Sequence, residues 1–319
     1  MKEFELIDKI KNLSKKIINK NYIKKSIGDD CAVLPFSKKH DLLVSTDQII
    51  EDTHFKLDWY NPSELVKKVL YSNISDINAC GGFPFACLLS AGLSSKFSDN
   101  YLMQFIKSLN AETKKFEIDL IGGDTCSAKY NYFTITLFGF VEKNEAIFRS
   151  GAKSGDYVYI TGEPGLSDAG LFLLLNNETL DSQYKKYLVK KHLIPSIIQN
   201  KNELKNIFND ANSMIDLSDG LSSELNHIAR ESKKKIIIKK DLIPINKNLK
   251  LFCKDYNKNI YKIIFSGGED YYLVFTSNKK ILNKNIYCIG WVENGAGVFL
   301  FEKDKYTKID RTGFEHQIN

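Results

Sequence analysis

Hydrophobic positions recur at helical spacing near the N-terminus and at strand spacing soon afterwards. Residues 3–19 carry one apolar stripe and are predicted to form a helix. The segment 61–82 is predicted to be a second helix, which Pro62 and Ser63 open and two glycines close. Strands are predicted at 41–47, 85–93 and 132–141, with a further helix at 98–115 and a short strand leading into 121–125. The first half therefore mixes strands and helices in alternation.

The segment GAKSGD at 151–156 is the best candidate for a domain boundary. A strand is predicted directly after it, followed by a helix at 166–175 and further helical stretches to about residue 208. Residues 213–232 predict a strand that turns sharply into a helix, and apolar segments rich in strand formers follow. We expect an α+β protein with two mixed α/β domains, residues 1–148 and residues 149–319.

The composition is that of a globular protein. With 319 residues and 43% apolar side chains, the chain can bury a real core. No stretch reaches the roughly 18–20 continuous apolar residues of a membrane helix, and the N-terminus lacks a signal-peptide core. We therefore expect a soluble, cytoplasmic protein that does not bind membranes. Its six cysteines show no CxxC or zinc-finger spacing, which favours reduced, buried thiols.

The formal charge of +6 comes from lysines spread along the chain, with a local run ESKKKIIIKKD at 231–241. A basic run of this kind is usually a solvated face. Arginines and aromatic residues are not interleaved as they are in nucleic-acid-binding segments, so we expect no nucleic-acid partner.

One kind of short acidic segment recurs along the chain. Asp or Glu stands beside small or hydroxyl residues at the end of an apolar run, in IGDD at 27–30, STDQ at 45–48, NISDI at 73–77, IGGDT at 121–125, IDLSDG at 215–220 and SGGED at 266–270. A turn or a helix cap explains any one of them, since these residue types favour both. Six occurrences instead favour a shared site, because carboxylates from distant segments converge only where cations neutralise them.

The segment at 215–220 is the most specific of the six. Capping explains Asp219 at a predicted helix start, but it does not explain Asp216 inside the apolar lead-in. Magnesium prefers hard oxygen ligands together with substrate phosphates, which fits the oxygens of these segments. The sequence contains no P-loop, EF-hand loop or HExxH motif. We therefore expect several Mg²⁺ ions that hold a polyphosphate.

Three further features have both an ordinary and a functional interpretation. His54 is the only histidine among the acidic segments; a lone histidine is more often structural, but a substrate contact fits its position. Arg149 in FRSGAK either grips a phosphate or makes a surface ion pair. GEPGLSDAG at 162–170 is either a phosphate loop at a helix N-terminus or a glycine-rich connection. None of these residues identifies the phosphate acceptor.

The ordered series of segments resembles the thiamine-monophosphate kinase family. The matching landmarks run from residue 27 to about 276: IGDDCAVL, STDQIIEDTHF, NISDINACGGFP, LIGGDT, RSGAKSGD, YITGEPGLSDAG, MIDLSDGLSSELNHIA and SGGEDYYLVFT. GFEHQ, near the C-terminus, resembles the family's terminal aromatic–x–His element. The resemblance implies an aminoimidazole ribonucleotide synthetase-like fold, shared with selenophosphate synthetase, in which N-terminal domains pair across a homodimer and ATP lies between domains.

The resemblance also implies an activity and a set of site residues. Members transfer the γ-phosphoryl group of ATP to thiamine monophosphate and so form thiamine diphosphate. The implied Mg²⁺ ligands are Asp30, Ser45, Thr46, Asp47, Asp76, Asp124, Asp216 and Asp219, of which Asp47, Asp124 and Asp216 are the expected catalytic residues. The implied ATP contacts are Gly123, Asp124, Arg149 and Ser218, and the implied contacts to thiamine monophosphate are His54, Glu269 and Phe314.

Direct in-line transfer is the mechanism that this resemblance implies. The acceptor is already an anionic phosphate, so no strong general base is required, and Mg²⁺ screens the repulsion between the two anions. The alternatives are another ATP-dependent enzyme of the same superfamily and a catalytically silent nucleotide- or metal-binding module. Residues 1–26 and the terminal HQIN contain no cysteine, unlike selenophosphate synthetases and hydrogenase-maturation relatives. Whether Asp29 joins Asp30 on a metal stays open.

Overall fold

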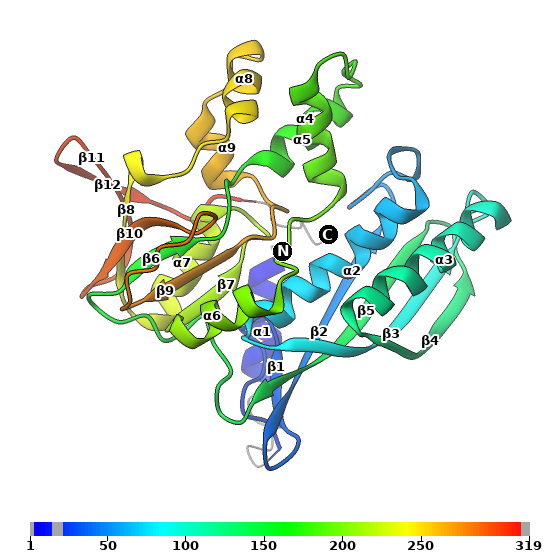
Figure 1. The fold of residues 1–319 in the computed structure, drawn as a ribbon, viewed down its shortest axis with the longest axis horizontal. Coiled ribbons are helices and arrows are strands. Elements are labelled where there is room, and N and C mark those ends of the chain that lie inside the picture. Colours follow the sequence, from blue (N-terminus) through cyan, green and yellow to red (C-terminus); the bar gives the residue numbers. More distant parts are fainter. Residues whose placement is uncertain (1–2, 15–21, 314–319) are drawn as a thin grey trace.

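Two mixed β-sheets form the two halves of the molecule, and helix α2 (Pro62–Ala79) runs between them (Figure 1). The computed structural model describes residues 3–14 and 22–313. The strand order is β1-β2-β5-β3-β4 in the first sheet and β12-β11-β8-β10-β6-β9-β7 in the second. One neighbouring pair in each sheet is parallel, β3–β4 and β8–β11, and the other pairs are antiparallel. The predicted α+β class with mixed sheets is confirmed.

The first sheet carries two long helices on one face. Its half of the molecule contains β1 (Ala32–Pro35), β2 (His40–Ile50), the short helix η1 (Leu57–Trp59), α2, β3 (Phe83–Leu93), α3 (Asp99–Phe116), β4 (Asp119–Ser127) and β5 (Tyr132–Glu142). α2 and α3 lie over the face that carries Leu43, Ile135 and Leu137, all fully buried. The helices predicted at 61–82 and 98–115 are confirmed within a few residues.

The second half follows residue 156. It contains β6 (Tyr157–Ile160), α4 (Leu166–Leu175), α5 (Gln183–Leu193), α6 (Lys201–Asp210), β7 (Ser213–Asp216), α7 (Leu221–Ser232), β8 (Lys235–Lys239), η2 (Lys240–Leu242), α8 (Lys247–Asp255), α9 (Ile260–Ser266), β9 (Leu273–Ser277), β10 (Tyr287–Glu293), β11 (Gly297–Glu302) and β12 (Lys305–Ile309). The predicted strand that turns into a helix at 213–232 is confirmed by β7 and α7.

The basic run at 231–241 is partly core, so its interpretation as a solvated face is wrong. Ile236, Ile237 and Ile238 are fully buried in β8, which lies between β10 and β11. Lys235 and Lys239 stand half-buried at the two ends of the strand. Burial of each isoleucine contributes roughly 1.5–3 kcal/mol, which outweighs the preference of the neighbouring lysines for water.

The local sequence explains both ends of α2. The Asn61 side chain accepts the backbone N–H of Glu64, and the Glu64 carboxylate accepts that of Asn61, which makes a capping box. The helix ends before Gly81, whose φ of 78° is a conformation that favours glycine. Most of α2 is buried, because it packs on β2 and β5 of the first sheet and on β7 of the second. Polar residues of α2 therefore face a buried space between the halves.

Residues 143–156 connect the two sheets, since β5 ends at Glu142 and β6 begins at Tyr157. The predicted domain boundary between residues 148 and 149 falls within this connection and stays a prediction. Helix α1 spans Glu3–Ser14, and the end of the helix predicted at 3–19 lies outside the described residues. Within residues 3–14 and 22–313, no helix combines the length and apolarity needed to cross a bilayer. All six cysteines are free; four are buried as predicted, whereas Cys288 is half-buried and Cys126 is exposed.

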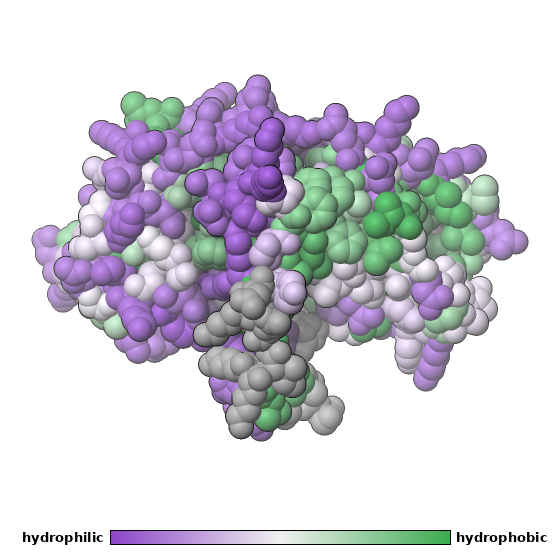
Figure 2. Space-filling view, turned by 90° about the horizontal axis from the view of Figure 1, so that it is seen from below, coloured by the Kyte–Doolittle hydropathy of each residue, from purple (hydrophilic) through white to green (hydrophobic). Residues whose placement is uncertain are grey.

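The outer face of the first sheet, on the side away from α2 and α3, is apolar. Figure 2 shows this hydrophobic area on the right of the molecule, seen from below. Phe85, Phe138 and Phe140 are half-buried there, and Phe85 stacks on Phe140 with 3.9 Å between ring centroids. On the edge strand β4, Leu120 is 48% exposed and Ile121 is 62% exposed.

Candidate active site

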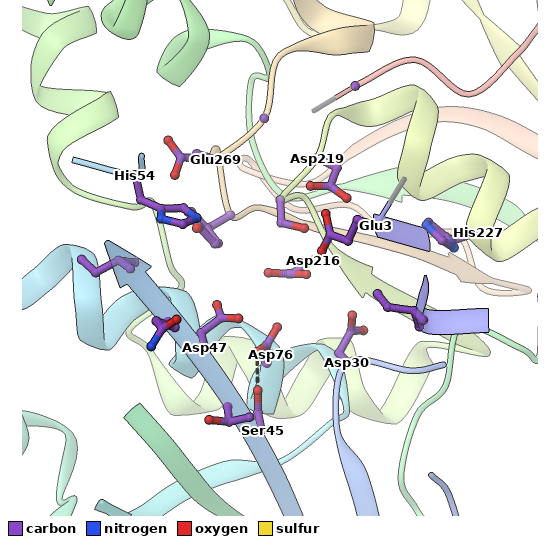
Figure 3. A pocket seen from close by; sticks show the side chains of 18 of the residues that line it. Glu3, Asp30, Ser45, Asp47, His54, Asp76, Asp216, Asp219, His227 and Glu269 are labelled. Carbon is purple, nitrogen blue, oxygen red and sulfur yellow. Dashed lines mark hydrogen bonds between the residues drawn. The ribbon is translucent and has the colours of Figure 1, made fainter. Parts of the chain in front are cut away.

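A cavity of about 1010 Å³ lies between the two halves, and side chains from both line it (Figure 3). The first half contributes the turn before β1, the end of β2 and Asp76 of α2. The connection between the sheets contributes Arg149, and the second half contributes the loop after β7 and the loop between α9 and β9. Five of the six acidic segments therefore meet at one cavity, and IGGDT on β4 does not take part.

Strand β2 presents two candidate ligands to this cavity. Alternation along the strand puts Ser45 and Asp47 on the face toward α2. It puts Thr46 on the outer face, where its hydroxyl lies 3.1 Å from that of Thr136. Because β1 pairs with β2 only as far as Val44, the backbone of β2 has an open edge beyond that point.

Side-chain hydrogen bonds fix β2 against α2. The Ser45 hydroxyl donates to Oδ2 of Asp76, and the backbone N–H of Asp47 donates to Oδ1 of Asn73 at 3.1 Å. Asn73 and Asp76 are three residues apart and so share one face of the helix. These two hydrogen bonds therefore hold the acidic segments STDQ and NISDI in contact.

Two more carboxylates complete the group that we call the carboxylate cluster: Asp30, Asp47, Asp76 and Asp216. Asp216 ends the fully buried strand β7, and Asp30 precedes β1. One oxygen each from Asp30, Asp76 and Asp216 lies within 4.8 Å of the others. The Oδ2 atoms of Asp30 and Asp216 are buried and accept no hydrogen bond from the described residues. Buried oxygens normally have a partner, so these atoms point to a ligand.

The electrostatics of the carboxylate cluster favour a bound cation. Burial, only partly offset by basic neighbours, raises the pKa of Asp30 and of Asp47 to about 6. Burial and the charge of Asp30 raise the pKa of Asp216 to about 8. Burial and the charges of the other three raise the pKa of Asp76 well above its ordinary value. A divalent cation among these all-oxygen ligands would remove the repulsion, and such a ligand set suits Mg²⁺.

Asp29 and Asp30 differ in their partners. Asp29 accepts the backbone N–H of Arg149 at 3.2 Å and forms an ion pair with Lys25 at 2.8 Å. The Arg149 guanidinium donates to Oδ1 of Asp30, which leaves Oδ2 of Asp30 available. Asp29 therefore holds the turn in place, and Asp30 is the better candidate for a metal ligand.

Ser218 and Asp219 lie in the loop after β7 and line the same cavity. The backbone N–H of Glu269 donates to the carbonyl oxygen of Ser218 at 2.7 Å. A Cβ on Gly268 would stand 2.3 Å from that oxygen, so the close approach of the two loops requires glycine. The backbone N–H of Asp219 donates to the buried carboxylate of Glu224 at 3.0 Å.

His54 and Glu269 lie beside each other at the opposite end of the cavity (Figure 3). Nδ1 of His54 accepts the backbone N–H of Ile50 at 3.1 Å. Oε1 of Glu269 lies 2.6 Å from Nζ of Lys68, an α2 lysine whose side chain is 1% exposed. Burial alone would raise the pKa of Glu269, but Lys68 and then His192 lower it below its usual value. The Glu269 carboxylate is therefore ionised.

Two of the predicted site residues lie away from the cavity within the described part of the chain. Gly123 and Asp124 lie on the exposed edge strand β4, and Asp124 is on its outer face. At Gly123 a Cβ would stand 1.8 Å from the carbonyl oxygen of Leu89, so the pairing of β3 with β4 requires glycine. Phe314 lies outside the described residues.

The cavity also uses residues that carry no recognisable motif. Lys68 supports Glu269, and Trp59 and His192 line the same end of the cavity. Lys67 and Lys68 together suggest a solvated face, but most of α2 is buried and Lys68 is buried with it. Because the two lysines are neighbours in the same helix, no local signal in the sequence marks Lys68 as the buried one.

Comparisons with known proteins agree with this architecture. Residues 28–141 match the AIR synthase related protein N-terminal domain, and residues 153–302 match the AIR synthase related protein C-terminal domain. The thiamine-monophosphate kinase of Buchnera aphidicola subsp. Schizaphis graminum is 37% identical to this chain, with 99% of each chain covered. The chain belongs to the thiamine-monophosphate kinase family. The thiamine-monophosphate kinase of Bacillus subtilis is 35% identical, again with 99% of each covered.

Solved structures of thiamine-monophosphate kinases share the fold. The structure described as AaThiL complexed with AMPPCP and TMP is 33% identical, has a TM-score of 0.88, and matches 99% of this chain and 97% of that chain. The enzyme from Stenotrophomonas maltophilia K279a is 26% identical, has a TM-score of 0.74, and matches 94% of this chain and 97% of that chain. The predicted aminoimidazole ribonucleotide synthetase-like fold is confirmed.

The raised pKa values predict how stability depends on pH without metal. Between pH 6.5 and about 8, the folded state keeps protons on Asp216 and Asp76 that the unfolded chain has released. In the presence of a chelator, the free energy of unfolding therefore falls as the pH rises through this window. The pKa values of the buried His192 and His227 are lowered, so below pH 6.5 the unfolded chain takes up protons on these residues that the folded chain does not. In that range they make the free energy of unfolding rise with pH.

Thermal unfolding at several pH values, with chelator and with millimolar Mg²⁺, measures this slope. Mg²⁺ should flatten it, and Asp216→Asn should raise the chelated Tm by ~5 °C at pH 8. Asp304→Asn, at an exposed hairpin position, is the matched control and should leave Tm unchanged. A chelated protein that gains stability between pH 6.5 and 8 would contradict the prediction.

Proposed function

We propose that this chain transfers the γ-phosphoryl group of ATP to thiamine monophosphate and releases thiamine diphosphate and ADP. The observation that carries the proposal is the meeting of five acidic segments at one cavity between the two halves. The relatives of about 35% identity over the whole chain are thiamine-monophosphate kinases. The related structure with AMPPCP and TMP holds an ATP analogue, which supports ATP as the phosphoryl donor.

Several Mg²⁺ ions are part of this proposal. Asp30, Asp47, Asp76 and Asp216 would hold them, with the Ser45 hydroxyl and Asp219 beside the cluster. Bound Mg²⁺ supplies charge neutralisation for the phosphates of both substrates. The two unpartnered carboxylate oxygens and the absence of nitrogen ligands in the cluster fit a hard cation.

The remaining side chains lie at two ends of the cavity, and each end would bind one of the two substrates. Arg149 and Ser218, at the end with Asp219, would bind the phosphates of ATP. His54 and Glu269, at the other end, would bind thiamine monophosphate. Asp47 and Asp76 lie between the two ends (Figure 3), where the two phosphates meet. The acceptor oxygen is already anionic, so the chain needs to orient the groups and exclude water rather than remove a proton.

A second copy of the chain is the partner that we propose for the outer face of the first sheet. That face carries half-buried phenylalanines and ends at the edge strand β4, on which Leu120 and Ile121 are exposed. An exposed apolar area next to an unpaired strand edge is typical of an interface. We therefore propose a homodimer formed through the first sheet.

The homodimer also gives Asp124 a place in the site. Within one chain, β5 and β3 separate β2 from β4, which puts Thr46 and Asp124 roughly 14 Å apart. Both side chains lie on the outer face of the sheet. We infer that the partner's Asp124 and Gly123 complete the metal and nucleotide site that Thr46 and Asp47 begin.

The direct test of the function is product analysis. Purified protein incubated with ATP, Mg²⁺ and thiamine monophosphate should form thiamine diphosphate and ADP in equal amounts, detected by liquid chromatography. ADP without thiamine diphosphate would instead favour a related enzyme with a different acceptor. Absence of nucleotide binding would favour a catalytically silent module.

Loss of a cluster carboxylate should remove most of the activity. Asp47→Asn or Asp216→Asn should lower kcat by roughly 10²-fold or more, because each removes a ligand charge that balances the phosphates. Isothermal titration should show weaker Mg²⁺ binding in the same variants, and Asp304→Asn serves as the control. Folded variants with near wild-type turnover would refute the metal role of these residues.

The interface should depend on β4. Ile121→Glu places a charge on the proposed contact and should give a monomer with little activity, because the site then lacks the partner's Asp124. Light scattering coupled to gel filtration measures the mass. The control is Leu282→Glu, at a position 89% exposed in the second half, which should stay dimeric. A wild-type monomer with full activity would rule out the shared site.

A further inference from the structure

The end of the cavity with His54 and Glu269 also contains an aromatic side chain that has no role in the mechanism so far. Trp59, at the end of η1, lines the cavity and is half-buried. It belongs to the first half, whereas Glu269 and His192 on the same wall belong to the second. The indole therefore stands where the halves meet.

The second half holds Trp59 in place through His192. The two rings meet edge to face, with 6.4 Å between centroids and an angle of 72°. His192 is itself fixed, because Nδ1 lies 3.1 Å from the Ser167 hydroxyl and 3.5 Å from Oε2 of Glu269. Burial, followed by the charge of Lys68, lowers the pKa of His192 to about 4. The imidazole is therefore neutral and does not repel a cation.

The face of the indole accepts a cation. The Lys56 ammonium lies over the Trp59 ring, 5.1 Å from the centroid. Lys56 is an exposed side chain on a flexible stem, so another cation can take its place at little cost. Glu269, ionised and 3.5 Å from the His192 ring that Trp59 meets, lines the same end of the cavity and supplies the negative charge that a cationic ligand requires.

We propose that Trp59 stacks on the cationic heteroaromatic ring of the phosphate acceptor, with Glu269 as the anionic wall of the same subsite. This inference rests on the proposed function, in which the acceptor, thiamine monophosphate, carries a thiazolium ring. An aromatic face next to a carboxylate binds a flat cation better than it binds a neutral ring of the same shape. Trp59 is thus a specificity-determining residue for the acceptor and makes no contact with ATP.

Fluorescence gives a test that does not depend on turnover. The chain has two tryptophans, and Trp291 lies on β10, outside the cavity lining, where its Nε1 donates to Glu293. In Trp291→Phe, Trp59 alone emits, and thiamine monophosphate should quench that emission saturably without ATP. In Trp59→Phe, Trp291 alone emits, and its signal should not change. Saturable binding by calorimetry with unchanged Trp59 emission would overturn the inference.

Kinetics give the second test. Trp59→Leu should raise KM for thiamine monophosphate by roughly 3- to 30-fold, with kcat and the KM for ATP within about twofold of wild type. Trp59→Tyr, which keeps an aromatic face, should recover most of the loss. Wild-type KM in Trp59→Leu would overturn the inference.

The variant Lys56→Gln distinguishes the contribution of the Trp59 ring from that of the Lys56 ammonium that lies over it. If the Trp59 ring binds the acceptor, removal of the competing ammonium should lower KM for thiamine monophosphate or leave it unchanged. A rise in KM would mean that Lys56, not Trp59, binds the acceptor. The kinetic outcomes require an active wild-type enzyme, so an inactive wild type refutes the proposed function, whereas the fluorescence and binding outcomes still test the Trp59 subsite.

Discussion

Repulsion among buried carboxylates is the constraint on which the rest of the structure depends. Asp30, Asp47, Asp76 and Asp216 line one cavity, where Asp216 is buried and the other three are half-buried, and their pKa values are all raised. Arg149 offsets part of the charge of Asp30, and Lys68 offsets part of that of Asp47. The side chains alone leave part of this repulsion uncompensated, and in the proposed function Mg²⁺ and the phosphates of the substrates would balance it.

The scaffold brings these charges together by placing them where backbone elements end. Asp216 ends β7, Asp30 precedes β1, and Asp47 stands on the part of β2 that β1 leaves unpaired. Only Asp76 sits inside a helix, and Ser45 secures it there. Strand ends and open edges leave space beside the side chain, so the same features that position each carboxylate also give a ligand access to it.

Periodicity and residue type predicted much of this arrangement. The helix at 61–82, the turn from strand to helix at 213–232 and the convergence of five acidic segments follow from local patterns. The position of β4 at the edge of its sheet does not, because the order of strands depends on pairing between distant segments. The sequence also could not show that Ile236–Ile238 would form a core strand, since lysines on both sides mask three buried residues.

The ion pair between Lys68 and Glu269 has a consequence for how substrates enter. It joins α2 of the first half to the loop before β9 in the second, and the lysine is almost completely buried. A hinge motion that opened the cavity like a clamshell would separate two charges in a poorly solvated place, at a cost of roughly 3–5 kcal/mol. Rigid opening of the halves is therefore disfavoured at this point. A substrate therefore has to reach a cavity whose two halves stay joined at this ion pair, with Glu3, Ile7 and Lys11 of α1 in its wall.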